Sequence, residues 1–85
     1  MFDKLKKIKE LKQVQDELAE EKISVEKQGI EVVVNGKMEI IKITLNLSLP
    51  KDALERTLKE CINEAVNKVQ IVVARKLSNF RGLGL

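Results

Sequence analysis

Hydrophobic residues recur at intervals of three and four near the start of the chain, and the positions between them are mostly charged or polar. This spacing places the hydrophobic side chains on one stripe of a helix, because a helix returns to the same face every 3.6 residues. The residues of the stripe are Leu5, Ile8, Leu11, Val14 and Leu18. The pattern predicts an amphipathic helix over about residues 3–22 that packs on a sheet or on a partner.

The hydrophobic period then changes to two, which is typical of strands. The dipeptide Asn35-Gly36 indicates a two-residue hairpin, because a type I′ turn needs positive φ at both central positions. We therefore expect strands at about 23–27, 30–34 and 37–46. In the last hairpin, the numbers of paired residues are predicted to sum to 71.

In that register the hairpin has two different faces. One face is apolar and is predicted to be core; it consists of Ile30, Val32, Val34, Ile41, Ile43 and Leu45. The other face places Val33, Met38 and Ile40 beside charged and polar residues. A half-apolar face is unfavourable in open water, so the pattern predicts a second layer that covers it.

Helical spacing returns over about residues 49–77. Pro50 suits the first turn of this helix, and Ser48 suits its cap. Ile71 and Ala74 lie off the main hydrophobic stripe, so the last turns are apolar on several sides and favour burial. At 1.5 Å per residue the helix runs roughly 40 Å, so its basic C-terminal end should extend beyond the sheet.

The predicted fold is α+β, with the order α-β-β-β-α in a single domain over residues 1–85. A three-stranded antiparallel sheet has a helix before and after it, and a short tail follows at 78–85. A chain of 85 residues buries only a little over about 60% of its unfolded surface, so a monomer is marginally stable. Small size and a two-sided apolar sheet together predict a homodimer, with candidate interface residues Val33, Met38, Ile40, Ile71 and Ala74.

The amino-acid composition excludes several kinds of catalytic and binding site. The chain has no His, Trp or Tyr, and its aromatic residues are Phe2 and Phe80. Histidine acid–base catalysis is therefore excluded, as are a zinc site and the aromatic platforms on which unpaired bases stack. The single cysteine, Cys61, suits a buried thiol in a reducing cytosol, and acidic pairs such as Glu60 and Glu64 suit a solvated helix surface. We expect no enzyme, no cofactor, no metal and no small-molecule substrate.

The net charge of +3 is unevenly distributed along the chain. Five lysines and two acidic residues give +3 over residues 1–12, seven basic and eleven acidic residues give −4 over 13–67, and four basic residues give +4 over 68–85. Two basic ends suggest phosphate contacts, although a lysine run on a helix is also typical of an ordinary solvated face. The candidate DNA-binding residues are Lys4, Lys6, Lys7, Lys9, Lys12, Lys68, Arg75, Lys76 and Arg81.

The kind of basic residue refines this hypothesis. Lysines outnumber arginines by 13 to 3, and lysine acts as a point charge rather than as a bidentate reader of guanine. The balance favours contact with the DNA backbone and little sequence preference. The shortage of aromatic residues favours duplex over single-stranded DNA.

Several motifs in order along the chain resemble the YbaB/EbfC nucleoid-associated proteins. They are the opening Met1-Phe2-Asp3-Lys4-Leu5-Lys6-Lys7, the strand from Ile30 that ends in Asn35-Gly36, the segment Asn46-Leu47-Ser48-Leu49 before a helix with Ala65-Val66-Asn67, and the tail Gly82-Leu83-Gly84-Leu85. The resemblance implies a homodimer that binds duplex DNA with little sequence preference. The chain departs from the family in having only Gly29 between the first two strands, Asn46-Leu47-Ser48 in place of Asp-Pro-Ser, and a shorter tail.

Two functions therefore follow from the sequence. The first is a cytoplasmic, nucleoid-associated protein that grips double-stranded DNA through its basic helix ends. The alternative is a small dimeric adaptor or chaperone-like module that binds proteins and not DNA. Neither involves a membrane, because no apolar segment approaches the roughly 20 residues of a spanning helix and no signal sequence is expected.

Overall fold

The computed structural model describes residues 2–79, with the side chains of residue 6 and of residues 9–78. Its elements are helix α1 (Phe2–Glu20), strands β1 (Lys22–Lys27), β2 (Ile30–Asn35) and β3 (Ile40–Thr44), and helix α2 (Lys51–Asn79). The strands form one antiparallel sheet in the order β1-β2-β3. The predicted α-β-β-β-α fold is confirmed.

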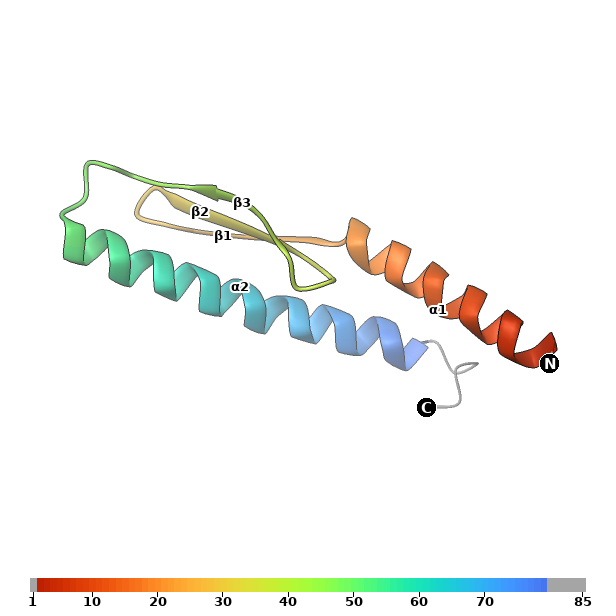
Figure 1. The fold of residues 1–85 in the computed structure, drawn as a ribbon. Coiled ribbons are helices and arrows are strands. Elements are labelled where there is room, and N and C mark those ends of the chain that lie inside the picture. Colours follow the sequence, from red (N-terminus) through yellow and green to blue (C-terminus); the bar gives the residue numbers. More distant parts are fainter. Residues whose placement is uncertain (1, 80–85) are drawn as a thin grey trace.

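The core lies between α2 and the first two strands. Helix α2 runs under the sheet (Figure 1) and packs on β1 and β2. The buried side chains of this layer are Val25, Ile30, Val32, Val34, Cys61, Ala65 and Val69. The interpretation of Cys61 as a buried thiol is confirmed, because its sulfur lies 3.9 Å from the carbonyl oxygen of Ile30 and burial raises the pKa of the thiol.

The two-residue turn with positive φ at both central positions joins β1 to β2 rather than β2 to β3. Gln28 has φ of 51° and Gly29 has φ of 80°, and they connect the paired residues Lys27 and Ile30. Two positive φ angles in a two-residue loop are the requirement of a type I′ turn. The prediction of this turn at Asn35-Gly36 was therefore wrong.

Asn35 instead organises a longer turn through its side chain. Its Oδ1 accepts the backbone N–H groups of Lys37 (2.9 Å) and Glu39 (3.1 Å), and its Nδ2 donates to Glu39 Oε1 (3.0 Å). The positive φ in this turn, 64°, belongs to Met38. Because the turn takes more residues, β3 begins at Ile40 instead of residue 37.

The longer turn changes the register of β3. Val32 pairs with Ile43 and Val33 with Lys42, so paired numbers sum to 75 rather than the predicted 71. An even shift preserves which face each residue occupies. The pairing of Val34 with Ile40 adds one extra residue, Ile41, and it moves Ile40 to the core side of the sheet.

The outer face of the sheet is consequently polar, and the prediction of a half-apolar outer face, which was the reason for expecting a covering layer, was wrong. Val33 shares this face with Ser24 and Lys42, its partners in the adjacent strands. Glu31 links all three strands, because its carboxylate accepts from Ser24 Oγ (3.1 Å) and lies 3.3 Å from Lys42 Nζ. These contacts, that with Ser24 first, lower the pKa of Glu31. Such a face is stable in water without a second layer.

Helix α1 ends two residues before the predicted position. The carbonyl oxygen of Leu18 accepts the N–H of Glu21 (3.1 Å) and the N–H of Gly36 (2.8 Å). Both bonds satisfy a carbonyl that has no partner within the helix. The chain then enters β1 at Lys22, and the end of α1 is fixed to the β2–β3 turn.

Helix α2 is displaced by two residues from its predicted range at both ends, since it runs from Lys51 to Asn79. The carbonyl of Pro50 accepts the N–H of Leu54 (2.8 Å). Before it, Asn46 Oδ1 accepts the N–H of Ser48 (3.1 Å) and holds the chain in a turn. This turn delays the start of the helix.

The contact at Gly36 gives a first prediction. A Cβ atom at this position would lie 2.3 Å from the carbonyl oxygen of Leu18, a backbone atom that can move only with α1. We expect Gly36→Ala to lower the free energy of unfolding by about 1–3 kcal/mol, measured by urea denaturation at fixed protein concentration. Lys37→Ala, which changes an exposed side chain in the same turn, is the control. Equal stability of the two variants would contradict the close approach.

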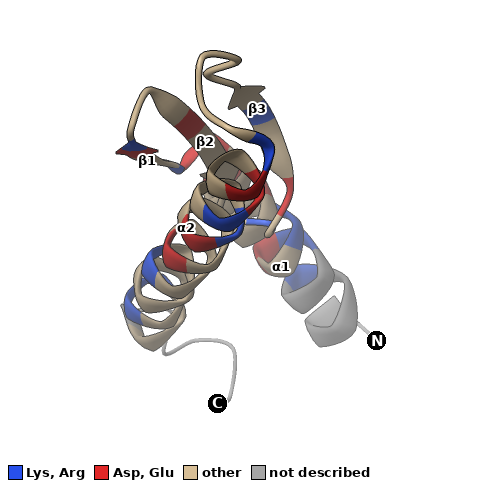
Figure 2. Ribbon diagram, turned by 90° about the vertical axis from the view of Figure 1, so that its left-hand side faces the viewer, with Lys and Arg blue, Asp and Glu red and all other residues tan. Residues whose placement is uncertain are grey.

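The two helices project from the sheet at the same end (Figure 1), and they diverge toward their free ends (Figure 2). The predicted extension of α2 beyond the sheet is confirmed. The radius of gyration is 16.8 Å, compared with about 12 Å for a compact domain of this length. The projecting helices, rather than the sheet, therefore present the basic ends of the chain.

Candidate nucleic-acid interface

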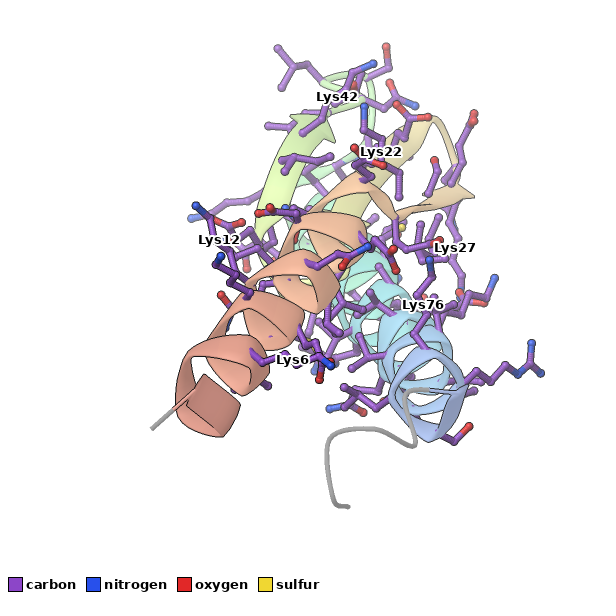
Figure 3. All side chains as sticks on the ribbon, turned by 90° about the vertical axis from the view of Figure 1, so that its right-hand side faces the viewer. Lys6, Lys12, Lys22, Lys27, Lys42 and Lys76 are labelled. Atoms are coloured by element: carbon purple, nitrogen blue, oxygen red, sulfur yellow. The ribbon has the colours of Figure 1, made fainter. Side chains whose placement is uncertain are left out.

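The projecting half of α1 carries an exposed group of lysines, here called the α1 lysine cluster: Lys6, Lys9 and Lys12. Steps of three residues turn each lysine by about 60° from the last, so the cluster covers an arc of about 120° over about 9 Å of helix. Lys6 points toward the side on which α2 lies, and Lys12 points to the opposite side (Figure 3). One strand of duplex DNA carries a phosphate about every 3.4 Å along its axis, so the cluster spans two or three phosphates.

The rest of α1 separates charge along its length. Residues 13–20 contain no basic residue and three acidic residues, Asp16, Glu17 and Glu20. These acidic residues lie at the end of α1 that joins the sheet, whereas the lysines lie toward the free end. The backbone of α1 also places Lys4 and Lys7 in the free half, but their side chains, like the whole of Arg81, fall outside the described residues.

Lys68 is held in an ion-pair network on α2. Its Nζ lies 3.5 Å from Glu64 Oε1, and Lys27 Nζ of β1 lies 3.0 Å from Glu64 Oε2. Contact with Lys27 is the main cause that lowers the pKa of Glu64, and contact with Glu64 raises the pKa of Lys27. Lys68 thus stands beside a carboxylate that already bridges the helix to the sheet.

Lys76 is also neutralised from within the chain. Its Nζ lies 2.9 Å from Glu21 Oε1, and both side chains are about one-third exposed. Contact with Glu21 raises the pKa of Lys76. The pair joins the C-terminal part of α2 to the junction of α1 and β1, so a DNA phosphate would have to compete with Glu21 for Lys76.

Four predicted DNA-binding residues therefore remain exposed and outside every ion pair that the structure describes between residues 2–79: the α1 lysine cluster and Arg75. The sequence analysis missed the pairing of Lys68 and Lys76. The spacing of Glu64 and Lys68 at i and i+4 is a signal for the first pair. Glu21 and Lys76 are 55 residues apart, so no local pattern could have revealed the second.

The five predicted dimer residues do not form one surface. Val33 lies on the outer face of the sheet, whereas Ile40 lies on the inner face. Met38 lies in the turn between them. Ile71 follows Ile62 by nine residues, which places it on the opposite side of α2, and Ala74 lies near Ile71 on that helix. These residues therefore remain a prediction without a common face.

No group of three or more metal-ligating side chains gathers within the part of the chain that the structure describes. Among the same residues, no helix is both long and apolar enough to cross a membrane. The α1 lysine cluster and Arg75 are exposed cations on the two projecting helices. Their arrangement suits an extended polyanion.

A sequence model of the YbaB/EbfC DNA-binding family matches residues 1–84. The chain is 38% identical over 74 residues to a nucleoid-associated protein of Mycoplasmopsis pulmonis (strain UAB CTIP), and the match covers 81% of this chain and 74% of that protein. It is 37% identical over 75 residues to a nucleoid-associated protein of Hahella chejuensis (strain KCTC 2396), covering 81% of this chain and 69% of that protein. These matches confirm the resemblance seen in the sequence motifs.

Proposed function

This chain belongs to the YbaB/EbfC DNA-binding family, and from that premise we propose that it is a nucleoid-associated protein that binds double-stranded DNA with little sequence preference. The observation that carries the proposal is the exposed α1 lysine cluster on a projecting helix. Lysine ammonium groups neutralise phosphates and release counterions, and this contribution does not depend on base sequence.

The proposed mechanism uses a homodimer. One chain offers a cluster that spans only two or three phosphates, and such a small contact is weak at physiological salt. Two chains in a fixed arrangement double the number of contacts and make the second contact effectively intramolecular. The basic tips of the two protomers would grip the backbone at two places on one duplex.

A salt titration tests this function. We expect the logarithm of the association constant for a mixed-sequence duplex to fall linearly with the logarithm of salt concentration, with a slope of about −0.9 for each phosphate neutralised. Duplexes of unrelated sequence should give the same affinity within a few fold. An affinity independent of salt, or no binding at low salt, would refute electrostatic DNA binding, and strong preference for one duplex would refute the lack of sequence preference.

A further inference from the structure

The ion pair between Lys76 and Glu21 joins the C-terminal part of α2 to the end of α1. Its charged atoms are 2.9 Å apart, and the Lys76 side chain is 32% exposed, whereas the other lysines in ion pairs within residues 2–79 are 42–86% exposed. Glu21 is held in place, because its N–H donates to the carbonyl oxygen of Leu18 (3.1 Å). Salt screens a partly buried pair less than an exposed one, so added salt weakens this pair less than it weakens an exposed contact with DNA.

The surroundings of the Lys76 ammonium group are acidic. Contact with Glu21 is the main cause that raises the pKa of Lys76, and the charges of Glu17 and Glu20 add to it. These three acidic residues lie in the last turn of α1 and just after it. Arg75, the preceding residue of α2, is exposed and is in none of the ion pairs described within residues 2–79. Consecutive residues of a helix point about 100° apart, so these two cations have different surroundings.

A DNA phosphate gains little by taking Lys76 from Glu21. A free lysine that neutralises a phosphate releases about 0.9 of a bound counterion, and this release drives binding. Lys76 already has an anionic partner, so its transfer to a phosphate exchanges one ion pair for another. The exchange also leaves the Glu21 carboxylate unpaired beside the DNA, where like charges repel. We therefore expect Lys76 to add much less to the affinity than an unpaired lysine of the α1 lysine cluster.

We propose that Glu21 acts as an internal competitor for DNA phosphate, which withholds Lys76 from the duplex and limits the affinity of the chain. This inference rests on the proposed DNA binding and names a residue that opposes it. The cations of the projecting helices then fall into two groups. The α1 lysine cluster and Arg75 are free to contact DNA, whereas Lys76 becomes available only when the charge of Glu21 is removed.

A double-mutant cycle of Glu21→Gln, Lys76→Gln and both together tests the proposal. The affinity for a mixed-sequence duplex is measured by fluorescence anisotropy at four salt concentrations. Glu21→Gln should raise the affinity by at least about 5-fold at 0.1 M salt and steepen the salt slope by about 0.9 per chain. Lys76→Gln alone should change the affinity by less than about twofold, but in the Glu21→Gln background it should cancel the whole gain. Equal effects of Lys76→Gln in the two backgrounds would overturn the proposal.

Glu26→Gln is the control for net charge. It makes the same chemical change at an exposed residue near the other end of β1, five positions further along the chain. Five residues of a strand span about 16 Å, which exceeds the Debye length of about 10 Å at 0.1 M salt. We expect Glu26→Gln to keep the affinity within about twofold of wild type. A gain as large as that of Glu21→Gln would overturn the proposal, because net charge alone would then explain both.

Labelling of lysine amines with an N-hydroxysuccinimide ester, read by peptide mass spectrometry, applies if Glu21→Gln fails to fold. Wild type without DNA should label Lys76 several-fold more slowly than Lys12, because the pair with Glu21 keeps the Lys76 amine protonated and partly covered. Duplex DNA should slow the labelling of Lys12 but not that of Lys76. Equal rates at Lys76 and Lys12 without DNA, or protection of Lys76 by DNA, would overturn this inference alone. A wild type that binds no duplex at low salt would refute the proposed function and, with it, this inference.

Discussion

Replacing the α1 lysine cluster by alanine (Lys6→Ala, Lys9→Ala and Lys12→Ala together) is expected to lower the affinity for duplex DNA on the order of 100- to 1,000-fold at 0.1 M salt. Each lysine that contacts a phosphate contributes about one unit to the slope of log affinity against log salt. Loss of three contacts removes up to about 2.7 units per chain and weakens all sequences alike. Gel shift or fluorescence anisotropy at four salt concentrations measures both quantities.

A control variant with the same change in net charge distinguishes direct DNA contact by the α1 lysine cluster from a general effect of net charge. Lys42→Ala, Lys51→Ala and Arg56→Ala also remove three positive charges and change the net charge from +3 to 0. These residues are exposed, and α2 begins, with Lys51, at the end of the molecule far from the free end of α1. We expect the control to retain most of the affinity and slope. If both triple variants lose affinity equally, DNA recognises only the net charge and the α1 lysine cluster is not the contact.

Replacing the buried Ile30 by alanine is expected to lower the free energy of unfolding far more than the same substitution at an exposed isoleucine. Ile30 is fully buried between the sheet and α2, beside Cys61. Truncation of a buried isoleucine removes its transfer free energy and leaves a cavity, so the free energy of unfolding should fall by about 2–5 kcal/mol. This is a large fraction of the about 5–15 kcal/mol that holds a typical domain folded. Urea denaturation at equal protein concentration measures the loss.

The same substitution at Ile71 is the control, because that side chain is 55% exposed. The chemical change is identical, and α2 gains slightly in helix propensity. We expect a change within about 1 kcal/mol. A loss at Ile71 as large as that at Ile30 would mean that the Ile71 side chain is buried, contrary to its 55% exposure.

The elements were predictable because their periods are long and regular. Val14 and Leu18 of the predicted stripe are buried as expected, whereas Leu11 is 48% exposed. The two-residue alternation correctly places Ile30, Val32 and Val34 in the core, but the β3 half of that predicted core face (Ile41, Ile43 and Leu45) is 44–45% exposed, because α2 packs on β1 and β2. The register of β3 was not predictable, because Asn35 can build a turn in two ways. It can adopt positive φ itself, or it can accept backbone N–H groups through its side chain. The second occurs in this chain, where the N–H of Gly36 is bonded to the distant carbonyl oxygen of Leu18, a contact that no local pattern reveals.

The sequence shows where the basic residues of the candidate site lie along the chain. It does not show which of them are already held in ion pairs within the protein. The separation into two basic ends is visible in the sequence, and the exposure of Lys9 and Lys12 follows from helical spacing. The engagement of Lys76 by Glu21 depends on how the end of α2 meets the start of β1. That distance is set by tertiary packing. Charge counting therefore overestimates the number of cations that α2 can offer to a partner.

Helix α2 has no break between Lys51 and Asn79, so a change of tilt at one end of the helix moves the other end. Thr57, in the first third of α2, is buried, and Arg75 lies 18 residues further on, about 27 Å along the axis. A rotation of the whole helix by about 5° about Thr57 would therefore displace Arg75 by about 2 Å. Substitutions that only retilt α2 at the sheet can thus alter where its basic end lies without touching a basic residue.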